Sequence, residues 1–195
     1  MGAGGAGVGR EERYWRCRRS LRLWPLEEAT KDKLDIFLLS KLGMTMEQLA
    51  SAGHVEIVLV GGKGPGAIHS EHVVTFQTKE FRDLVRSSAQ KLSLLPPNTA
   101  GLRLEIPDFL QNNFKVLQNA GYQIKKKSQG ARRNVIFDDE DLDLALDVRV
   151  DDQGDWQRIR PAEARAAGAR PGKGTSARRS LDAASISSMM GSAAP

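Results

Sequence analysis

The sequence predicts an α+β chain built from two antiparallel-sheet modules, and three observations support this class. Short apolar or alternating segments bounded by Pro and Gly recur along the chain, as expected for strands. Between the first of them lie two segments with apolar residues at helical spacing, each preceded by a Thr that can cap a helix. The chain has 195 residues, 40% of them hydrophobic, which suffices for one domain and a fraction or for two small domains.

Four strands and two main helices are expected in the first half of the chain. The strands cover residues 20–26, 54–60, 71–78 and 102–106, and the helices begin after the caps Thr30 and Thr78. The segment 54–60 is β-branched and apolar throughout, which favours a buried strand. Thr45 and Gln48 have the spacing of a capping box for a further helical turn. Residues 61–70 are too rich in Gly and Pro for regular structure, so an irregular loop is expected there.

This order of elements, β-α-β-β-α-β, is the ferredoxin-like split βαβ arrangement, in which two helices cover one face of a four-stranded antiparallel sheet. RNA-recognition motifs have this arrangement and stack bases on aromatic residues of the open face. In the first strand Leu21 and Leu23 alternate with Arg22 and Trp24, so that Arg22 and Trp24 are expected on the open face. The third strand is expected to expose Glu71, Val73 and Thr75, none of them aromatic. Arg22 can stack on a base or bind phosphate. Trp24 can contact a base as well, or it can instead fill a gap under the second module.

A second module is expected to follow directly. Asp108 can cap a helix that carries Leu110, Phe114 and Leu117 and stops at Gly121. The strands of this module are expected at residues 122–127, 132–137, 142–150 and 156–160. The sequence thus predicts a flexible N-terminus at 1–13, an RNA-recognition-motif-like domain at 14–106, a small helix-plus-antiparallel-sheet C-terminal domain at 107–165, and a disordered tail at 166–195.

The distribution of charge suggests a polyanionic partner or charge-paired self-assembly. The formal net charge is +5, yet the segment Lys115–Arg133 holds six cations and no acid, while Asp138–Asp155 holds nine acids and one Arg. The cations of residues 125–133 are expected on a basic hairpin that binds phosphates. A second basic stretch, Arg13–Arg19, interleaves Tyr14 and Trp15 with arginines, a pattern that combines charge with base stacking.

The sequence offers little support for catalysis or for a bound metal. The acids of residues 137–143, FDDEDLD, begin like a calcium loop, but Leu144 stands where the loop needs Gly and no Glu closes it. A solvated acidic loop, with its acids paired to Lys125–Lys127 of the same or a neighbouring chain, is favoured over a metal-dependent nuclease site. No catalytic residue, metal ligand or cofactor is predicted. The single Cys17 and the lack of an apolar run that spans a bilayer favour a cytoplasmic or nuclear protein with no membrane partner.

Three segments resemble the first-open-reading-frame nucleic-acid-binding protein of long-interspersed (non-LTR) retrotransposons. They are SLRLWPL at residues 20–26, HVVTFQTKEFRDLVRSSAQK at 72–91 and LRLEIPDFLQNNFKVLQNAGYQIKKK at 102–127. That family carries an RNA-recognition motif followed at once by a small C-terminal domain. The resemblance covers roughly residues 18–150 and rests on the order and spacing of elements.

The resemblance implies a non-enzymatic protein that binds single-stranded RNA, or single-stranded DNA, and that packages retrotransposon RNA in a ribonucleoprotein or acts as a nucleic-acid chaperone. It implicates Arg22, Arg103, Lys125, Lys126, Lys127, Arg132 and Arg133, to which the basic N-terminal stretch adds Arg18 and Arg19, and the first strand Trp24. The family trimerises through a coiled coil, and no heptads precede Tyr14 here. Two alternatives follow: self-association uses other surfaces, or the chain is a fragment or a solitary copy. The alternative function is a protein-protein interaction module on the same fold.

Overall fold

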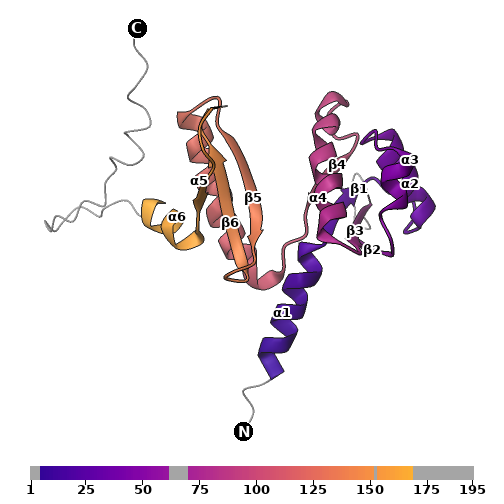
Figure 1. Cartoon of the computed structure of the whole chain (residues 1–195), viewed down its shortest axis with the longest axis horizontal. Coiled ribbons are helices and arrows are strands. Elements are labelled where there is room, and N and C mark those ends of the chain that lie inside the picture. The colour runs from indigo at the N-terminus through magenta and orange to yellow at the C-terminus, as the bar shows by residue number, and fades with distance from the viewer. Residues whose placement is uncertain (1–4, 62–69, 152, 169–195) are drawn as a thin grey trace, which may run out of the picture.

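The computed structural model, which describes residues 5–61, 70–151 and 153–168, shows an α+β chain with two antiparallel sheets (Figure 1). Its helices are α1 (Gly5–Arg18), α2 (Lys31–Ser40), α3 (Met46–Ala50), α4 (Lys79–Ser88), α5 (Gln111–Lys127) and α6 (Pro161–Gly168), with 3-10 helices η1 (Ala89–Leu94) and η2 (Asp108–Leu110). Its strands are β1 (Ser20–Trp24), β2 (Val55–Gly61), β3 (Glu71–Phe76), β4 (Gly101–Leu104), β5 (Arg132–Asp138), β6 (Asp143–Arg149) and β7 (Gln157–Ile159). The predicted class is therefore confirmed.

The first module comprises β1 to β4 with α2, α3 and α4. Its strands lie in the order β2-β3-β1-β4, and all neighbours are antiparallel. Leu21 and Leu23 of β1 are fully buried against the helices, in one core with Val74 of β3, Phe37 of α2 and Val85 of α4. The other face of the sheet carries no helix of this module, and β1 turns Arg22 and Trp24 toward it, as the alternation predicts.

The predicted helix N-caps of the first module are confirmed. The side chains of Thr30 and Thr78 accept hydrogen bonds from backbone N–H groups in the first turns of α2 and α4. Thr45 and Gln48 form the predicted capping box of α3. Gly43, which follows α2, has a φ of 59°, a left-handed conformation that favours glycine.

The prediction of a buried second strand is wrong. β2 lies at the edge of the sheet, and Val58 and Val60 are 42% and 44% exposed. On β3, Thr75 is buried rather than exposed. Its hydroxyl lies 2.8 Å from that of Ser20, which donates a hydrogen bond to the backbone oxygen of Arg16 in α1. The irregular loop expected after β2 falls largely on residues 62–69, outside the described residues.

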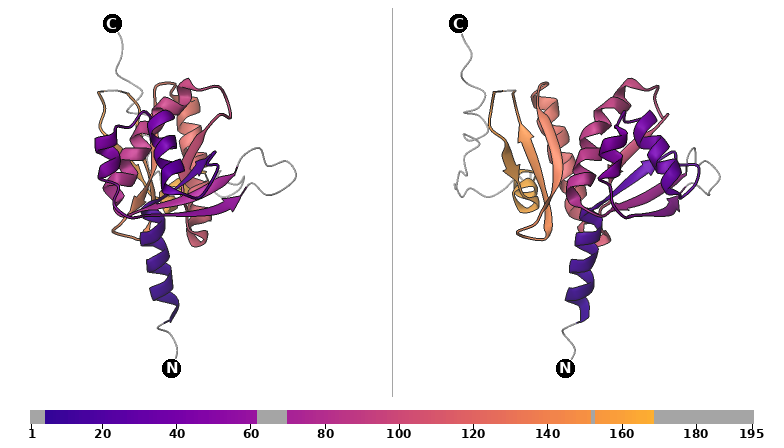
Figure 2. Two further views of the ribbon diagram at one scale, coloured as in Figure 1. Left: turned by 90° about the vertical axis from the view of Figure 1, so that its right-hand side faces the viewer. Right: turned by 45° about the vertical axis from the view of Figure 1, so that its right-hand side comes forward.

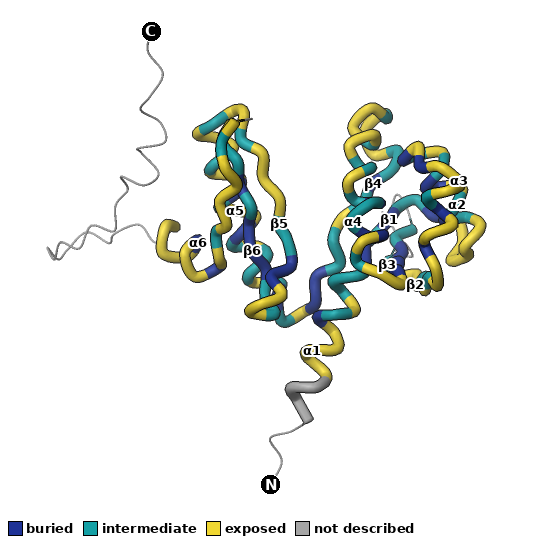
Figure 3. The backbone as a smooth tube through the Cα atoms, viewed as in Figure 1, coloured by how far each residue is buried: buried dark blue, intermediate teal, exposed yellow. Residues whose placement is uncertain are grey.

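The second module comprises α5, β5 to β7 and α6, and α1 packs onto it. Its sheet has the order β5-β6-β7, and Leu117 of α5 is buried against Leu144, Leu146 and Val148 of β6. Tyr14 of α1 is fully buried in the same core. The two modules lie side by side, and the N-terminal part of α1 extends away from both (Figure 2). Buried positions are present in both modules (Figure 3).

Three boundaries in and around the second module differ from the prediction. Residues 5–13, expected to be flexible, belong to α1. Residues 122–127, expected to be a strand, belong to α5, which continues through Gly121. A side chain at Gly121 would lie 3.2 Å from Arg133 and 3.4 Å from Leu146, so the glycine allows α5 to approach the sheet closely. Residues 166–168, expected in the tail, belong to α6; the rest of that tail lies outside the described residues.

Candidate nucleic-acid interface

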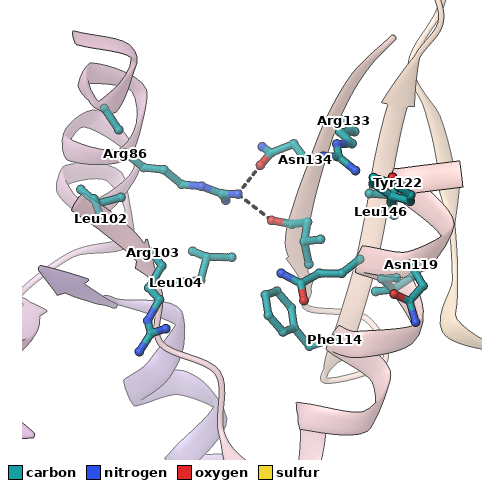
Figure 4. A pocket seen from close by; sticks show the side chains of 15 residues that line it. Arg86, Leu102, Arg103, Leu104, Phe114, Asn119, Tyr122, Arg133, Asn134 and Leu146 are labelled. Atoms are coloured by element: carbon teal, nitrogen blue, oxygen red, sulfur yellow. Dashed lines mark hydrogen bonds between the residues drawn. The ribbon is translucent and has the colours of Figure 1, made fainter. Parts of the chain in front are cut away.

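A groove separates the two modules. It encloses a cavity of about 630 Å³, with α4 and β4 on one wall and α5, β5 and β6 on the other (Figure 4). The residues that line it include the cations Arg86, Arg103 and Arg133, the aromatic residues Phe114 and Tyr122, the amides Gln118, Asn119 and Asn134, and the apolar residues Leu102, Leu104 and Leu146. Its described lining contains no acidic residue. The walls therefore combine positive charge, amide groups and aromatic rings.

Arg86 reaches across this groove from α4 to β5. Its guanidinium donates a hydrogen bond of 2.8 Å to the backbone oxygen of Val135 and another to the side-chain oxygen of Asn134 (Figure 4). Burial and the nearby positive charge of Arg82 lower the pKa of Arg86 to about 10, which leaves the side chain charged at neutral pH. Because both hydrogen-bond partners are neutral, an anion in the groove would be stabilised by this charge.

Two of the predicted binding residues lie on opposite walls of the groove. Arg103 comes from the edge strand β4, and Arg133 from the edge strand β5. Tyr122, which lies about one turn before the end of α5 and lines the groove, is 59% exposed. An exposed ring beside arginines is a platform on which an unpaired base can stack.

The other predicted cations of the second module lie beyond Tyr122. Lys125, Lys126 and Lys127 form the exposed last turn of α5, where lysines interact favourably with the negative end of the helix dipole. Arg132 is exposed at the start of β5. The expected hairpin is thus a helix, a turn and a strand, and its cations extend from the end of the groove.

The open sheet face differs from the groove, because its charges are matched. Arg22 is paired with Glu105 and, at 3.5 Å, with Glu71, and hydrogen bonding to Glu105 raises the pKa of Arg22. Arg103 lies 2.8 Å from the same Glu71. The indole of Trp24 covers Gly101 on β4, so tightly that a side chain at Gly101 would overlap the ring, and the guanidinium of Arg103 lies 6.0 Å from the ring centre. Arg22 and Trp24 thus lie on the sheet face, and Arg103 links that face to the groove.

The N-terminal basic stretch is used for packing between elements. The hydroxyl of the buried Tyr14 donates a 3.2 Å hydrogen bond to Asp139, and burial raises the pKa of Tyr14. The prediction that Tyr14 stacks on bases is therefore wrong. Arg18 is paired with the same Asp139, and Arg19 donates a 3.0 Å hydrogen bond to the backbone oxygen of Gln77. These contacts join α1 to both modules.

The acidic loop between β5 and β6 is paired with arginines. Asp138 is buried and lies 3.6 Å from Arg160, which also contacts Asp141 at 2.5 Å. The cations in these pairs are Arg18 and Arg160, whereas the sequence predicts Lys125–Lys127. In the described parts of the chain no group of three or more His, Cys, Asp and Glu residues is arranged to hold a metal ion.

A second cavity, of about 730 Å³, shares Arg86 and Asn134 with the groove. Its lining contains cations such as Arg82 and Lys79 together with the acids Asp83, Asp138, Asp139 and Glu140. Because its charges are of both signs, this cavity is a poorer site for a polyanion than the groove.

Sequence reasoning missed Arg86 and Tyr122 as groove residues. Arg86 belongs to no sequence motif that indicates binding. It reaches the groove through the packing of α4 against the second module. Tyr122 was assigned to a strand, although the three lysines that follow it are typical of a helix C-terminus.

Among the described residues, no helix has both the length and the apolar character needed to cross a membrane. Comparison with protein-family models and with curated protein sequences finds no match to this chain.

Proposed function

We propose that the protein is a non-enzymatic nucleic-acid-binding protein whose single-stranded RNA, or single-stranded DNA, lies in the groove between the two modules. The observation that carries this proposal is the composition of the groove walls: Arg86 and Arg133, the rings of Phe114 and Tyr122, and no acidic side chain among the described lining residues. Clustered arginines bind phosphates, and exposed rings bind bases by stacking.

The groove favours a single strand over a duplex. Tyr122 can stack only on a base whose face is free, and the bases of a duplex are already stacked on each other. Arg86 and Arg133, which come from opposite walls, can contact phosphates of one strand lying between them, whereas the side chain of Arg103 is paired with Glu71 on the sheet face. Lys125, Lys126, Lys127 and Arg132 would continue the same phosphate track beyond Tyr122.

The proposal includes a specific fold for the first module and a family resemblance for the whole chain. The element order of the first module and its strand order β2-β3-β1-β4 support a ferredoxin-like, RNA-recognition-motif-like domain. The small α+β module that follows directly supports the resemblance to retrotransposon first-frame proteins, and with it RNA packaging or chaperone activity in the cytoplasm or nucleus. The proposed binding site is the groove rather than the sheet face, because the charge of Arg22 on that face is neutralised by Glu71 and Glu105.

The test is a fluorescence-anisotropy titration of the full chain with single-stranded RNA, single-stranded DNA and duplex RNA of one length across a salt series. We expect both single strands to bind more tightly than the duplex and to weaken steeply as salt increases. Equal affinity for duplex and single strand, or no binding at physiological salt, contradicts the proposal.

One observation favours the alternative, a protein-interaction module. On the open face, Arg16 is paired with Glu56 at 2.7 Å in addition to the pairs of Arg22 and Arg103, so this face has matched charges and little attraction for a polyanion. The alternative predicts negligible RNA binding at physiological salt and a protein partner recovered in stoichiometric amount.

A further inference from the structure

The strand β2 has one edge without a hydrogen-bonding neighbour in the described sheet. It forms the end of the order β2-β3-β1-β4 and, among the described strands, pairs with β3 alone. The backbone N–H and C=O groups on its outer edge are therefore available to another strand, and such an edge is a template for pairing between chains.

The exposed apolar side chains of β2 favour pairing along the central part of this edge. Val58, Leu59 and Val60 are 42%, 36% and 44% exposed, although they are apolar and consecutive. Natural edge strands are commonly protected by lysine, proline, an inward-pointing charge or a β-bulge. β2 has one such feature, a register shift against β3 between Leu59 and Gly61, near the end of the strand. The strand Val55–Gly61 has neither lysine nor proline, and its one charged residue, Glu56, is paired with Arg16 at 2.7 Å.

We propose that two copies of the chain associate by antiparallel pairing of their β2 strands about a two-fold axis at Val58. In this register Val58 faces its own copy and Ile57 faces Leu59, so that the central pairs lie in the part of β2 that precedes the register shift between Leu59 and Gly61. The exposed apolar residues of both copies come together, and the two glutamates do not face each other, which avoids a destabilising like-charge pair. The interface is self-complementary, as a two-fold axis requires, and it joins the two four-stranded sheets into one.

This surface is separate from the groove. The groove borders β4, which forms the opposite edge of the same sheet. Dimerisation through β2 therefore leaves the groove accessible, and it places the grooves of the two copies at the two ends of the joined sheet. The association does not depend on the proposed binding of nucleic acid.

The test is sedimentation velocity on the full chain, freed of nucleic acid by nuclease treatment and high salt, over a wide range of concentration. We expect the mass to increase from one chain to two, and the association to persist at high salt, because it is held by apolar side chains and backbone hydrogen bonds. Assembly bridged by nucleic acid would instead be lost with the nuclease and salt. A single-chain mass at every concentration overturns the proposal.

Two variants make the test specific. Val58→Lys places a charge at the axis and is expected to give a single-chain mass, whereas Met46→Lys, at an apolar residue of α3 that is 69% exposed, is expected to leave the dimer intact. In a Cys17→Ser background, Val58→Cys is expected to form a disulfide-linked dimer on mild oxidation, since directly opposed residues of antiparallel strands lie within disulfide range. Met46→Cys in the same background is expected to form none. An unchanged mass for Val58→Lys, or equal cross-linking of the two cysteine variants, overturns the proposal.

Discussion

The guanidinium of Arg86 donates a 2.8 Å hydrogen bond to the backbone oxygen of Val135 and thereby connects the first module to the second. The acceptor is available because β5 is an edge strand, and β6 is its one neighbour among the strands that the structure describes. A guanidinium has five N–H donors, and only some of them are used by Val135 and Asn134. Arg86 can therefore hold the two walls in place and still contact a phosphate in the groove.

Replacing Arg86 with Ala is expected to weaken binding of single-stranded RNA about tenfold, which is the scale of one hydrogen bond to a charged group. The variant loses both the charge in the groove and the link to β5. Arg165→Ala removes an arginine that bonds Asn113, which does not line the groove, and should leave affinity unchanged. Anisotropy titrations of the two variants at one salt concentration make the comparison. Equal affinities for both variants would remove Arg86 from the site.

The triple variant Lys125→Ala, Lys126→Ala, Lys127→Ala is expected to weaken binding of every sequence tested and to reduce the salt dependence. If six cations contact phosphates of a single strand, log K falls with log salt at a slope of about −4, and removal of three cations brings the slope to about −2. A matched control, Lys31→Ala, Lys33→Ala and Lys41→Ala, removes three charges in and next to α2. A slope that is the same for both triple variants excludes the lysines of α5 from phosphate contact.

Gly101→Ala is expected to destabilise the fold by about 1–3 kcal/mol, the usual cost of overpacking. The new methyl group would overlap the indole of Trp24, which would have to leave its place on β4. Gly130→Ala is the control, because a side chain there would lie at an ordinary 3.6 Å from the backbone oxygen of Val150. Urea unfolding followed by circular dichroism measures both variants. The packing described for Trp24 is refuted by a Gly101→Ala variant as stable as the wild type.

His72 is expected to make the fold less stable in mild acid. Burial lowers the pKa of His72 below its ordinary 6.5, and its Nδ1 atom has no hydrogen-bond partner among the described residues. The unfolded chain therefore takes up a proton more readily than the folded chain. The contribution of neutral His72 to the free energy of unfolding is fully present above pH 6.5. It is lost as the pH falls from 6.5 toward the lower pKa of the folded chain, and the free energy of unfolding then changes by at most about 1.4 kcal/mol per pH unit.

The measurement is the free energy of unfolding of the wild type, His72→Gln and His54→Gln over this pH range. His54 is exposed, so its variant should follow the wild type, while His72→Gln should lose the part of the slope due to this group. Identical pH dependence in all three proteins would show that His72 titrates alike in the folded and unfolded chains.

The elements that are specified locally were predictable from the sequence. Thr30 and Thr78 cap their helices through side-chain hydrogen bonds to the next turn, a contact that involves only neighbouring residues. The alternation in β1 likewise places Leu21 and Leu23 in the core without reference to distant parts of the chain. Edge position was not predictable, since the run of apolar residues in β2 has the same pattern in a buried strand.

Elements that depend on distant contacts were missed. The glycine-rich start of α1 has no helical signal, and Tyr14 is buried by residues more than ninety positions later in the chain. Gly121 resembles a helix stop, yet α5 continues because the glycine allows it to approach Leu146. In the candidate site, the resemblance named Arg103 and Arg133, which do line the groove, but Arg86 reaches it only through the packing of the two modules.

The central claim is that a single strand lies between the two modules and contacts both. Titration of the isotope-labelled chain with single-stranded RNA, followed by the NMR shifts of its backbone amides, tests it most directly. We predict that Leu102–Leu104 on one wall and Arg133–Val135 on the other shift together, in proportion to the RNA bound. Shifts confined to one wall, or to the sheet face around Arg22, would contradict binding in the groove.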